Sequence, residues 1–229
     1  MSELHQLKIL KSWDETPSFR GLVLEAGALK GGHTAPGQYL EIILSPEAKG
    51  YFALANGPGQ ENFELLLKRG GAAADALSAL PVGASVPSKA PGGKGYPLAQ
   101  HKGKDILLFA AGSGIAPIRA AAQYIRARRW DFGEVVLFYG QRNAGDFAYE
   151  TELTDLEKQD IPVVRVLSGG DAAWRSHRGH VQEAFLRLRS KWKLQDPVAY
   201  ACGMKPMVQG VKDALAQAGF TGERVFQNF

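Results

Sequence analysis

Residues 105–125, DILLFAAGSGIAPIRAAAQYI, carry the clearest structural signal of the sequence. Its apolar run is typical of a strand buried on both faces, and it turns through Gly112-Ser113-Gly114 into a helix-like segment. The glycines permit a tight or positive-φ turn and leave room for a ligand, while Pro117 suits the first helical turn. A helix start offers free N–H groups to a phosphate. The stretch predicts either a nucleotide-binding turn or a purely structural one.

The rest of the C-terminal half repeats this rhythm of apolar strand and amphipathic helix. Strands are predicted at DILLFAA, EVVLFYG, IPVVRVLS, PVAYACG and RVFQNF. Helical spacing places two sets of apolar residues on single faces: Val181, Phe185, Leu188 and Trp192, and then Val208, Val211, Leu215 and Ala218. This alternation predicts an open, doubly wound parallel α/β domain with helices on both faces of the sheet.

The N-terminal half instead shows short strands with alternating apolar residues. GQYLEIIL places Leu40, Ile42 and Leu44 on one face, and NFELLLKR does the same for Phe63, Leu65 and Leu67. Turn residues such as Asn56-Gly57-Pro58-Gly59 separate the strands, and AAADALSAL reads as one short helix. The pattern predicts a small antiparallel β-barrel. With the boundary in the segment 90–104, we expect domains at 1–100 and 101–229.

Composition narrows the possible functions. The chain has 229 residues, a net charge of +4 and a single cysteine, which excludes an intrachain disulfide and a four-thiolate iron–sulfur cluster. The charge is too small to indicate nucleic acid as a partner. No apolar segment reaches the roughly 20 residues of a membrane span, and the N-terminus lacks the pattern of a secretory signal. A cytoplasmic protein with no membrane partner is expected.

Several motifs together resemble those of the ferredoxin–NADP reductase-like flavoproteins. GSGIAPIRA matches the GxGxxP loop of that family, VVLFYGQRNAGDFAYETEL its YGxR segment with a downstream E-L, and YACGMKPMVQGV its Cys-Gly motif. PGQYLEI and GGKGYPL match its barrel and interdomain segments. The resemblance implies an NAD(P)H-dependent oxidoreductase in which the barrel holds FAD and the second domain holds the nicotinamide dinucleotide.

The resemblance also assigns residues of the second domain to the nucleotide. It implies that Gly112, Ser113, Gly114 and Pro117 line the pyrophosphate and nicotinamide, with Arg142 near the adenosine half. Cys202 would help to hold the nicotinamide against the flavin by packing, and Gly203 and Met204 would follow it in the site. Phe229, or less favourably Phe226, would stack on the flavin ring.

The barrel departs from the flavin motifs of this family. The R-x-Y-S motif falls on Gly50, Phe52 and Ala53, followed by Leu54 and Asn56, so the arginine and the serine are lost while an aromatic ring remains. The G-x-x-S-x-x-L helix start falls on 71–77, where the serine has become Ala74. Each lost charge-assisted hydrogen bond is worth about 1.5–3 kcal/mol. We therefore expect bound FAD that is held loosely.

Two features could compensate for the lost anchors. The N–H groups of Ala72, Ala73 and Ala74, after Gly71, could still cap a phosphate. Lys68 and Arg69 could supply the missing positive charge, although they could equally be a solvated strand end.

The choice between NADH and NADPH depends on the end of the third strand of the second domain. Ser168 and Asp171 favour the free ribose of NADH, whereas Arg175 and Arg178 could bind the 2′-phosphate of NADPH. Gly169 occupies the place where NADPH-using members of the family often have arginine. The sequence favours NADH.

Three functions remain open at this stage. The first is a reductase that passes electrons from NAD(P)H through FAD to a separate acceptor, which could be a ferredoxin-like or other redox protein or a small molecule. The second is a flavin-deficient regulatory or subunit module that only binds the dinucleotide. The third is a reductase of freely diffusing flavin, which weak flavin anchoring would also explain.

Overall fold

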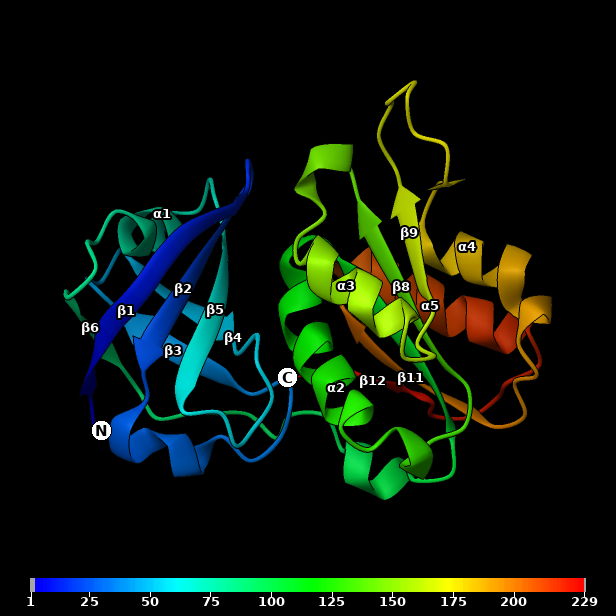
Figure 1. Cartoon of the computed structure of the whole chain (residues 1–229), viewed down its shortest axis with the longest axis horizontal. Coiled ribbons are helices and arrows are strands. Elements are labelled where there is room, and N and C mark those ends of the chain that lie inside the picture. The colour runs from blue at the N-terminus through cyan, green and yellow to red at the C-terminus, as the bar shows by residue number, and fades with distance from the viewer. Residues whose placement is uncertain (1–2, 229) are drawn as a thin grey trace.

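The computed structural model describes residues 3–228, which form two units side by side (Figure 1). The first unit is a six-stranded antiparallel sheet in the order β4-β3-β6-β1-β2-β5. Its elements are β1 (His5–Thr16), β2 (Phe19–Glu25), β3 (Tyr39–Ile43), β4 (Lys49–Ala53), β5 (Asn62–Lys68), helix α1 (Ala72–Ser78) and β6 (Ser85–Ser88). A bridge between Leu54 and Leu65 joins the two edges, so that the sheet closes into a barrel.

Alternation along the strands builds the core of the barrel. Leu40 and Ile42 of β3 are buried against Phe63, Leu65 and Leu67 of β5, as the period-two pattern predicts. Their neighbour Leu66 points the other way and packs into the core of the second unit. Strand β5 therefore belongs to the barrel and also to the boundary between the domains.

The second unit is an all-parallel sheet in the order β10-β9-β8-β7-β11-β12. Its strands are β7 (Asp105–Ala111), β8 (Val135–Gln141), β9 (Val163–Leu167), β10 (His177–Arg178), β11 (Pro197–Cys202) and β12 (Val225–Phe226). The chain moves outward from β7 to β10 and then returns to the other side of β7. The strand order thus reverses between β7 and β11, and ligands bind at the carboxyl ends of strands beside such a switch point.

Helices cover both faces of this sheet (Figure 1). On one face α2 (Ile115–Arg126) and α3 (Glu150–Glu157) pack against residues such as Leu108 and Leu137. On the other, α4 (Val181–Leu188) and α5 (Lys205–Gln217) pack against Phe109 and Phe138. The predicted fold class, a barrel followed by a doubly wound α/β domain, is confirmed.

Short 3-10 turns complete the structure, and two details differ from the sequence-based expectation. The turns are Gly27–Gly32, Leu98–His101, Gly112–Gly114, Arg129–Asp131, Ala144–Asp146 and Arg189–Lys191. The last of them ends α4 early, so Trp192 lies beyond the helix although it still packs against the same core. The two-residue strand β10 was not predicted, because only its pairing with β9 defines it.

The segment between the two sheets runs from Ser88 to Asp105. The division of the chain at residue 100 falls inside the turn Leu98–His101 and stays a prediction. Within this segment Tyr96 is buried and packs edge-on against Tyr200 of β11, with the ring centroids 5.1 Å apart. None of the helices between residues 3 and 228 is both long and apolar enough to cross a membrane.

A polar contact, here called the seam, joins the two domains along α2. Arg119 of α2 donates to the carbonyl of Ala55 (3.0 Å) and to the carboxylate of Glu64 (2.8 Å) in the barrel, and it also pairs with Glu152 of α3. One turn further on, Gln123 accepts the N–H of Gly57 (2.9 Å) and donates to Glu152 (2.8 Å). The guanidinium thus bridges carboxylates from both domains.

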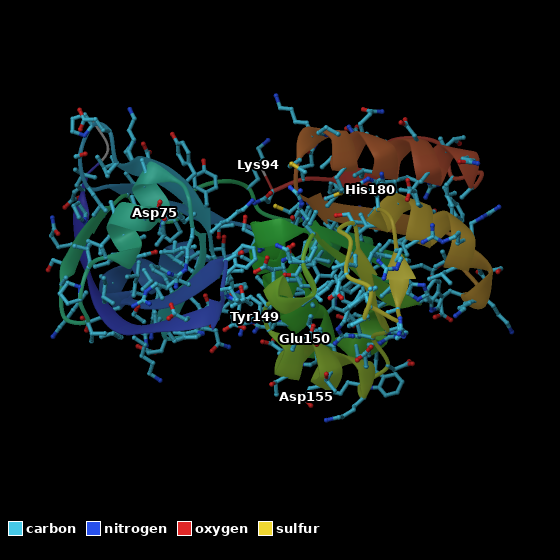
Figure 2. All side chains as sticks on the ribbon, turned by 90° about the horizontal axis from the view of Figure 1, so that it is seen from above. Asp75, Lys94, Tyr149, Glu150, Asp155 and His180 are labelled. Carbon is cyan, nitrogen blue, oxygen red and sulfur yellow. The ribbon has the colours of Figure 1, made fainter. Side chains whose placement is uncertain are left out.

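A second contact extends the seam to the β1–β2 hairpin. The backbone N–H of Tyr149 donates to the carboxylate of Glu15 (2.7 Å), and its ring lies 4.2 Å from the guanidinium carbon of Arg119. Tyr149 adopts a left-handed conformation with φ 64° as it starts α3. Figure 2 shows this residue where the two domains meet.

Candidate functional site

A cleft of about 230 Å³ lies between the barrel and the switch point of the parallel sheet. Its lining comes from β3, β4, β5 and α1 on the barrel side and from the ends of β7 and β11 on the other. The lining residues are Tyr39, Tyr51, Phe52, Ala53, Leu66, Lys68, Ala74, Ser113, Gly114, Ala116, Pro117, Cys202 and Asn228. Residues far apart in the sequence therefore form one site, and this set is called the cleft below.

The two glycines after β7 serve different physical purposes. Gly112 has φ 58° with open space where a Cβ would be, so the turn requires its backbone freedom. A Cβ on Gly114 would lie 2.1 Å from the carbonyl oxygen of Cys202, so this glycine allows the loop after β7 to touch the end of β11. Pro117 occupies the first turn of α2, as predicted. The tight turn of the loop therefore depends on Gly112, and its contact with the end of β11 depends on Gly114.

Cys202 ends β11 and faces the cleft as a neutral thiol. Burial raises its pKa from the ordinary value of 9.0 to about 12. A thiol of that pKa neither attacks nor accepts a proton near neutral pH, so it acts by shape and polarizability. Gly203 follows it where a Cβ would meet Met207 and Ala111, whereas Met204 is exposed at the start of α5.

Aromatic rings dominate the barrel side of the cleft. Phe52 packs against the barrel core and lies over Gly50 of the same strand. Tyr39 and Tyr51 meet edge to face, with centroids 5.3 Å apart. The sequence reading missed both tyrosines as well as Leu66, although Tyr39 stands in the PGQYLEI motif and Tyr51 directly precedes Phe52.

Four barrel residues or segments predicted for the cofactor lie outside the cleft lining. Leu54 is fully buried in the barrel core. Asn56 is buried as a turn residue, where its amide donates to the carbonyl of Asn62 (2.7 Å) and accepts from the N–H of Glu64 (2.9 Å). Arg69 forms an ion pair with Asp14. The segment 71–73 begins α1, and only Ala74 of that helix reaches the cleft.

The predicted adenosine end lies at the carboxyl ends of β8 and β9. Arg142 is exposed directly after β8, and Gly169 packs so closely against its backbone that a Cβ would lie 1.9 Å from the Arg142 carbonyl oxygen. Ser168 follows β9 and donates to the carbonyl of Gln141 (3.3 Å), while the Asp171 carboxylate accepts the N–H of Ala173 (2.9 Å). Arg142, Ser168 and Asp171 thus gather at one edge of the sheet.

Arg178 organises the loop at this edge. Its guanidinium donates to the carbonyls of Gly169 (3.5 Å), Asp171 and Trp174 (3.2 Å). Trp174 of the same loop stacks on Phe147, with ring centroids 5.2 Å apart and planes at 8°. A guanidinium that already binds three carbonyls is poorly placed to bind a 2′-phosphate as well.

The C-terminal segment enters the space between the domains. Phe229, predicted to stack on the flavin, lies outside the described residues. Phe226 belongs to β12 and packs against His101 (4.7 Å between centroids) and Tyr200 rather than lining the cleft. Asn228 does line the cleft; its amide donates to the carbonyl of Gly37 (3.3 Å), and its Oδ1 is buried without a hydrogen-bond partner among residues 3–228. Nothing in the local sequence pattern pointed to this residue.

Comparison with known proteins supports the class that this geometry defines. Residues 108–213 match the family of the oxidoreductase NAD-binding domain. The sequence is 26% identical to Sulfhydrogenase 1 subunit gamma of Pyrococcus furiosus, over 97% of this chain and 78% of that protein. It is 27% identical to the electron transfer subunit of dihydroorotate dehydrogenase B (NAD(+)) of Shouchella clausii, over 90% of this chain and 76% of that one.

A solved structure extends the likeness to the whole fold. The ferredoxin NADP+ reductase of Neisseria gonorrhoeae, determined with bound FAD and NADP, superposes with a TM-score of 0.83 at 16% identity, covering 99% of this chain and 98% of that one. Other matches are partial: one covers 54% of this chain and 47% of NADH-cytochrome b5 reductase 2 of Scheffersomyces stipitis, and another covers 82% of this chain but only 24% of a nitrate reductase [NADPH] of Fusarium oxysporum.

A β-barrel and a parallel α/β domain enclose a cleft at the switch point of the parallel sheet. The second half of the chain matches the oxidoreductase NAD-binding domain family, and the whole chain shares the fold of a ferredoxin NADP+ reductase, so the resemblance seen in the sequence is confirmed. At this level it is an oxidoreductase module of the NAD(P)-binding, electron-transfer type.

The residues of the cleft fit the ring system of a flavin. Phe52, Leu66 and the two tyrosines give an apolar, aromatic wall, and Pro117 and Cys202 face it from the second domain. Such a slot suits a flat aromatic ring, which gains from offset or edge contacts with aromatic side chains. Lys68 is the single cationic residue of the described lining.

Proposed function

We propose that the chain is an NAD(P)H-dependent flavin oxidoreductase that delivers electrons to a separate acceptor. The observation that carries this proposal is the cleft itself, in which the loop ends of β7 and β11 face an aromatic wall of the barrel. A dinucleotide along the carboxyl edge of the sheet would bring its nicotinamide to the same place where the barrel offers a slot for a flat ring.

The side chains in the cleft have positioning roles in this proposal. When bound, FAD or a related flavin would supply the capacity to take electrons as a pair and to release them singly. Gly112 and Gly114 leave backbone space for the nicotinamide half, and Cys202 packs behind it as an uncharged thiol. Hydride transfer needs the reacting atoms about 3–3.5 Å apart more than it needs a base, so packing residues suffice.

NADH is the donor that we propose. Ser168 and Asp171 stand at the edge where the ribose would lie, and the guanidinium of Arg178 is already engaged by loop carbonyls. Arg142 and Arg175 are the exposed cations at that edge. Steady-state rates with NADH and NADPH at equal concentrations test this point; at least a fivefold preference for NADPH would contradict it.

The acceptor is proposed to be a separate redox protein or small molecule. One relative is named an electron transfer subunit and another a gamma subunit, so their names place them in assemblies. By analogy, the present chain would hand its electrons to an acceptor that is a separate molecule.

Anaerobic mixing tests the redox proposal directly. The purified protein, with flavin added if it comes out colourless, is mixed with NADH, and the visible absorbance of the flavin is followed. We expect bleaching that requires the protein. Binding of NADH without any bleaching, with every flavin tried, would instead indicate a module that only binds the dinucleotide.

A further inference from the structure

The strand β4 and the helix α1 touch where an arginine of the flavin motif would stand. A Cβ built on Gly50 would lie 3.2 Å from the Cβ of Ala73 in α1 and 3.2 Å from the ring of Phe52. Both distances are shorter than ordinary van der Waals contact, so even an alanine would have to push a neighbour aside. Because Gly50 and Ala73 are small, helix α1 and the ring of Phe52 can pack closely against β4 at position 50.

The start of α1 already has a carboxylate. Asp75 lies in its first turn and accepts the N–H of Gly70 (2.9 Å), and Figure 2 shows it on the helix. This carboxylate places a negative charge beside the first turn of α1, where it would repel a phosphate.

Few cationic side chains near the start of α1 are available to bind a phosphate. Arg69 is paired with Asp14, which binds Arg20 as well at 2.7 Å. Within the described cleft lining, Lys68 alone carries a positive charge. One exposed lysine can attract a phosphate weakly but cannot hold the two phosphates of a dinucleotide tail in a fixed position.

The shape of the cleft agrees with these charges. Its enclosed part of about 230 Å³ has an aromatic wall that suits a flat ring system.

We infer that the barrel recognises only the isoalloxazine ring, so that riboflavin, FMN and FAD bind with similar affinity as exchangeable flavins. The inference rests on the proposed function, of which it names the flavin substrate class. Each turnover would transfer one hydride from NADH to the flavin; with one proton from solvent this gives dihydroflavin and NAD+, and the reduced flavin leaves to deliver its two electrons elsewhere.

Dissociation constants for the three flavins test this inference. Quenching of flavin fluorescence on titration with the protein should give values within about threefold of one another. An FAD value at least thirtyfold lower than that of riboflavin would overturn the inference while leaving the proposed reductase intact. If none of the three flavins binds, the proposed function fails together with it.

Three variants test which barrel residues determine the relative affinities for riboflavin, FMN and FAD. Lys68→Ala should abolish any small preference for FMN over riboflavin, whereas Lys49→Ala, at the start of β4 and outside the cleft lining, should leave the ratio unchanged. The double variant Gly50→Arg with Ala73→Gly restores a cation and makes room for it. Only the contact with the Cβ of Ala73 is removed, so the ring of Phe52 must still shift by a few tenths of an ångström. The double variant should bind FAD at least tenfold more tightly than riboflavin. A folded double variant with equal affinities would show that position 50 does not control phosphate binding.

Discussion

The two domains meet in two regions of opposite character. At the seam, Arg119 is surrounded by the carboxylates of Glu64 and Glu152, a carbonyl and an aromatic ring. At the cleft, the described lining is mostly aromatic and apolar, and the side-chain oxygen of Asn228 has no hydrogen-bond partner within the described part of the chain. Both regions lie between the same two domains, so the difference is one of chemistry rather than of place.

This difference separates two tasks of the boundary between the domains. Partly buried charges that are mutually satisfied hold the domains at a defined separation, because any shift would leave a charge without its partner. In this arrangement the ion pairs of the seam fix the position of one domain relative to the other. The side chains of the cleft are then free to serve in ligand recognition.

Removing the charge at the seam should have the largest effect. Arg119→Leu leaves two partly buried carboxylates without their cation, and breaking such a pair costs about 3–5 kcal/mol when it is well buried. Because the side chains are 12–19% exposed, we expect the free energy of unfolding to fall by about 3 kcal/mol. Urea denaturation measures it.

Two further variants show whether the loss of unfolding free energy in Arg119→Leu comes from the broken ion pairs. Arg126→Leu, on the same helix but without an ion pair among the described residues, should change stability by less than about 0.5 kcal/mol. Adding Glu64→Gln and Glu152→Gln to Arg119→Leu should recover part of the stability. If Arg119→Leu is as stable as the parent protein, the seam does not hold the domains.

The apolar character of the cleft should appear in the reactivity of Cys202. A pKa of about 12 in place of 9.0 lowers the thiolate fraction at pH 8 about a thousandfold. Alkylation by iodoacetamide should be slower in the folded protein by at least that factor than in urea, and it should accelerate tenfold per pH unit up to about pH 12. A folded-state rate close to the unfolded one would show that the thiol is not shielded.

The same shift has a consequence for stability. The folded state binds the thiol proton more tightly than the unfolded state, so the favourable contribution is complete below about pH 9 and is lost as the pH rises toward 12. Replacing the thiol in Cys202→Ala should therefore make the alkaline decline in unfolding free energy less steep.

A third test concerns the contact between the loop after β7 and the end of β11, on the side of the cleft proposed for the nucleotide. Gly114→Ala places a Cβ 2.1 Å from the Cys202 carbonyl oxygen, and overpacking of this kind costs about 1–3 kcal/mol. We expect weaker NADH binding as well, because the loop after β7 must move. Gly145→Ala, where no atom lies within 4 Å, is the matched control and should leave both properties unchanged.

The smallest expected effect is at the exposed nucleotide edge. Arg142→Ala should weaken NADH binding about fivefold, which corresponds to about 1 kcal/mol for a solvent-exposed charge contact. Because such a contact is screened by salt, the difference between the variant and the parent should shrink at high ionic strength. Isothermal titration at two salt concentrations measures both effects, and an unchanged affinity at low salt would place the dinucleotide elsewhere.

The sequence predicted the elements that local pattern controls. The run 105–111 became β7 with those bounds, and the alternating residues Leu40 and Ile42 are buried as expected. The turn after β7 was also predicted correctly, since Gly112 has a positive φ that only its residue type suggests. Patterns of period two and 3.6 are local, and a buried face enforces them.

The sequence could not reveal contacts made between distant segments. Arg69 was considered as a charge for the cofactor, but Asp14, 55 positions away along the chain, takes its guanidinium. Tyr51 and Tyr39 join the cleft because β3 and β4 pair with one another, which fixes both rings at the same edge. The seam was not predicted for the same reason, because no residue near Arg119 in the sequence indicates that Glu64 lies beside it in the fold.

The arrangement around Arg119 also limits how this protein can be recombined with its relatives. Its two carboxylate partners come from different domains, one before and one after the connecting segment. Consider a chimera in which the barrel comes from a relative without an acidic residue at the position of Glu64. In that chimera Arg119 would keep only Glu152 as its carboxylate partner at the boundary between the domains. Shuffling of such modules would therefore succeed only when the acid and the arginine are exchanged as a pair.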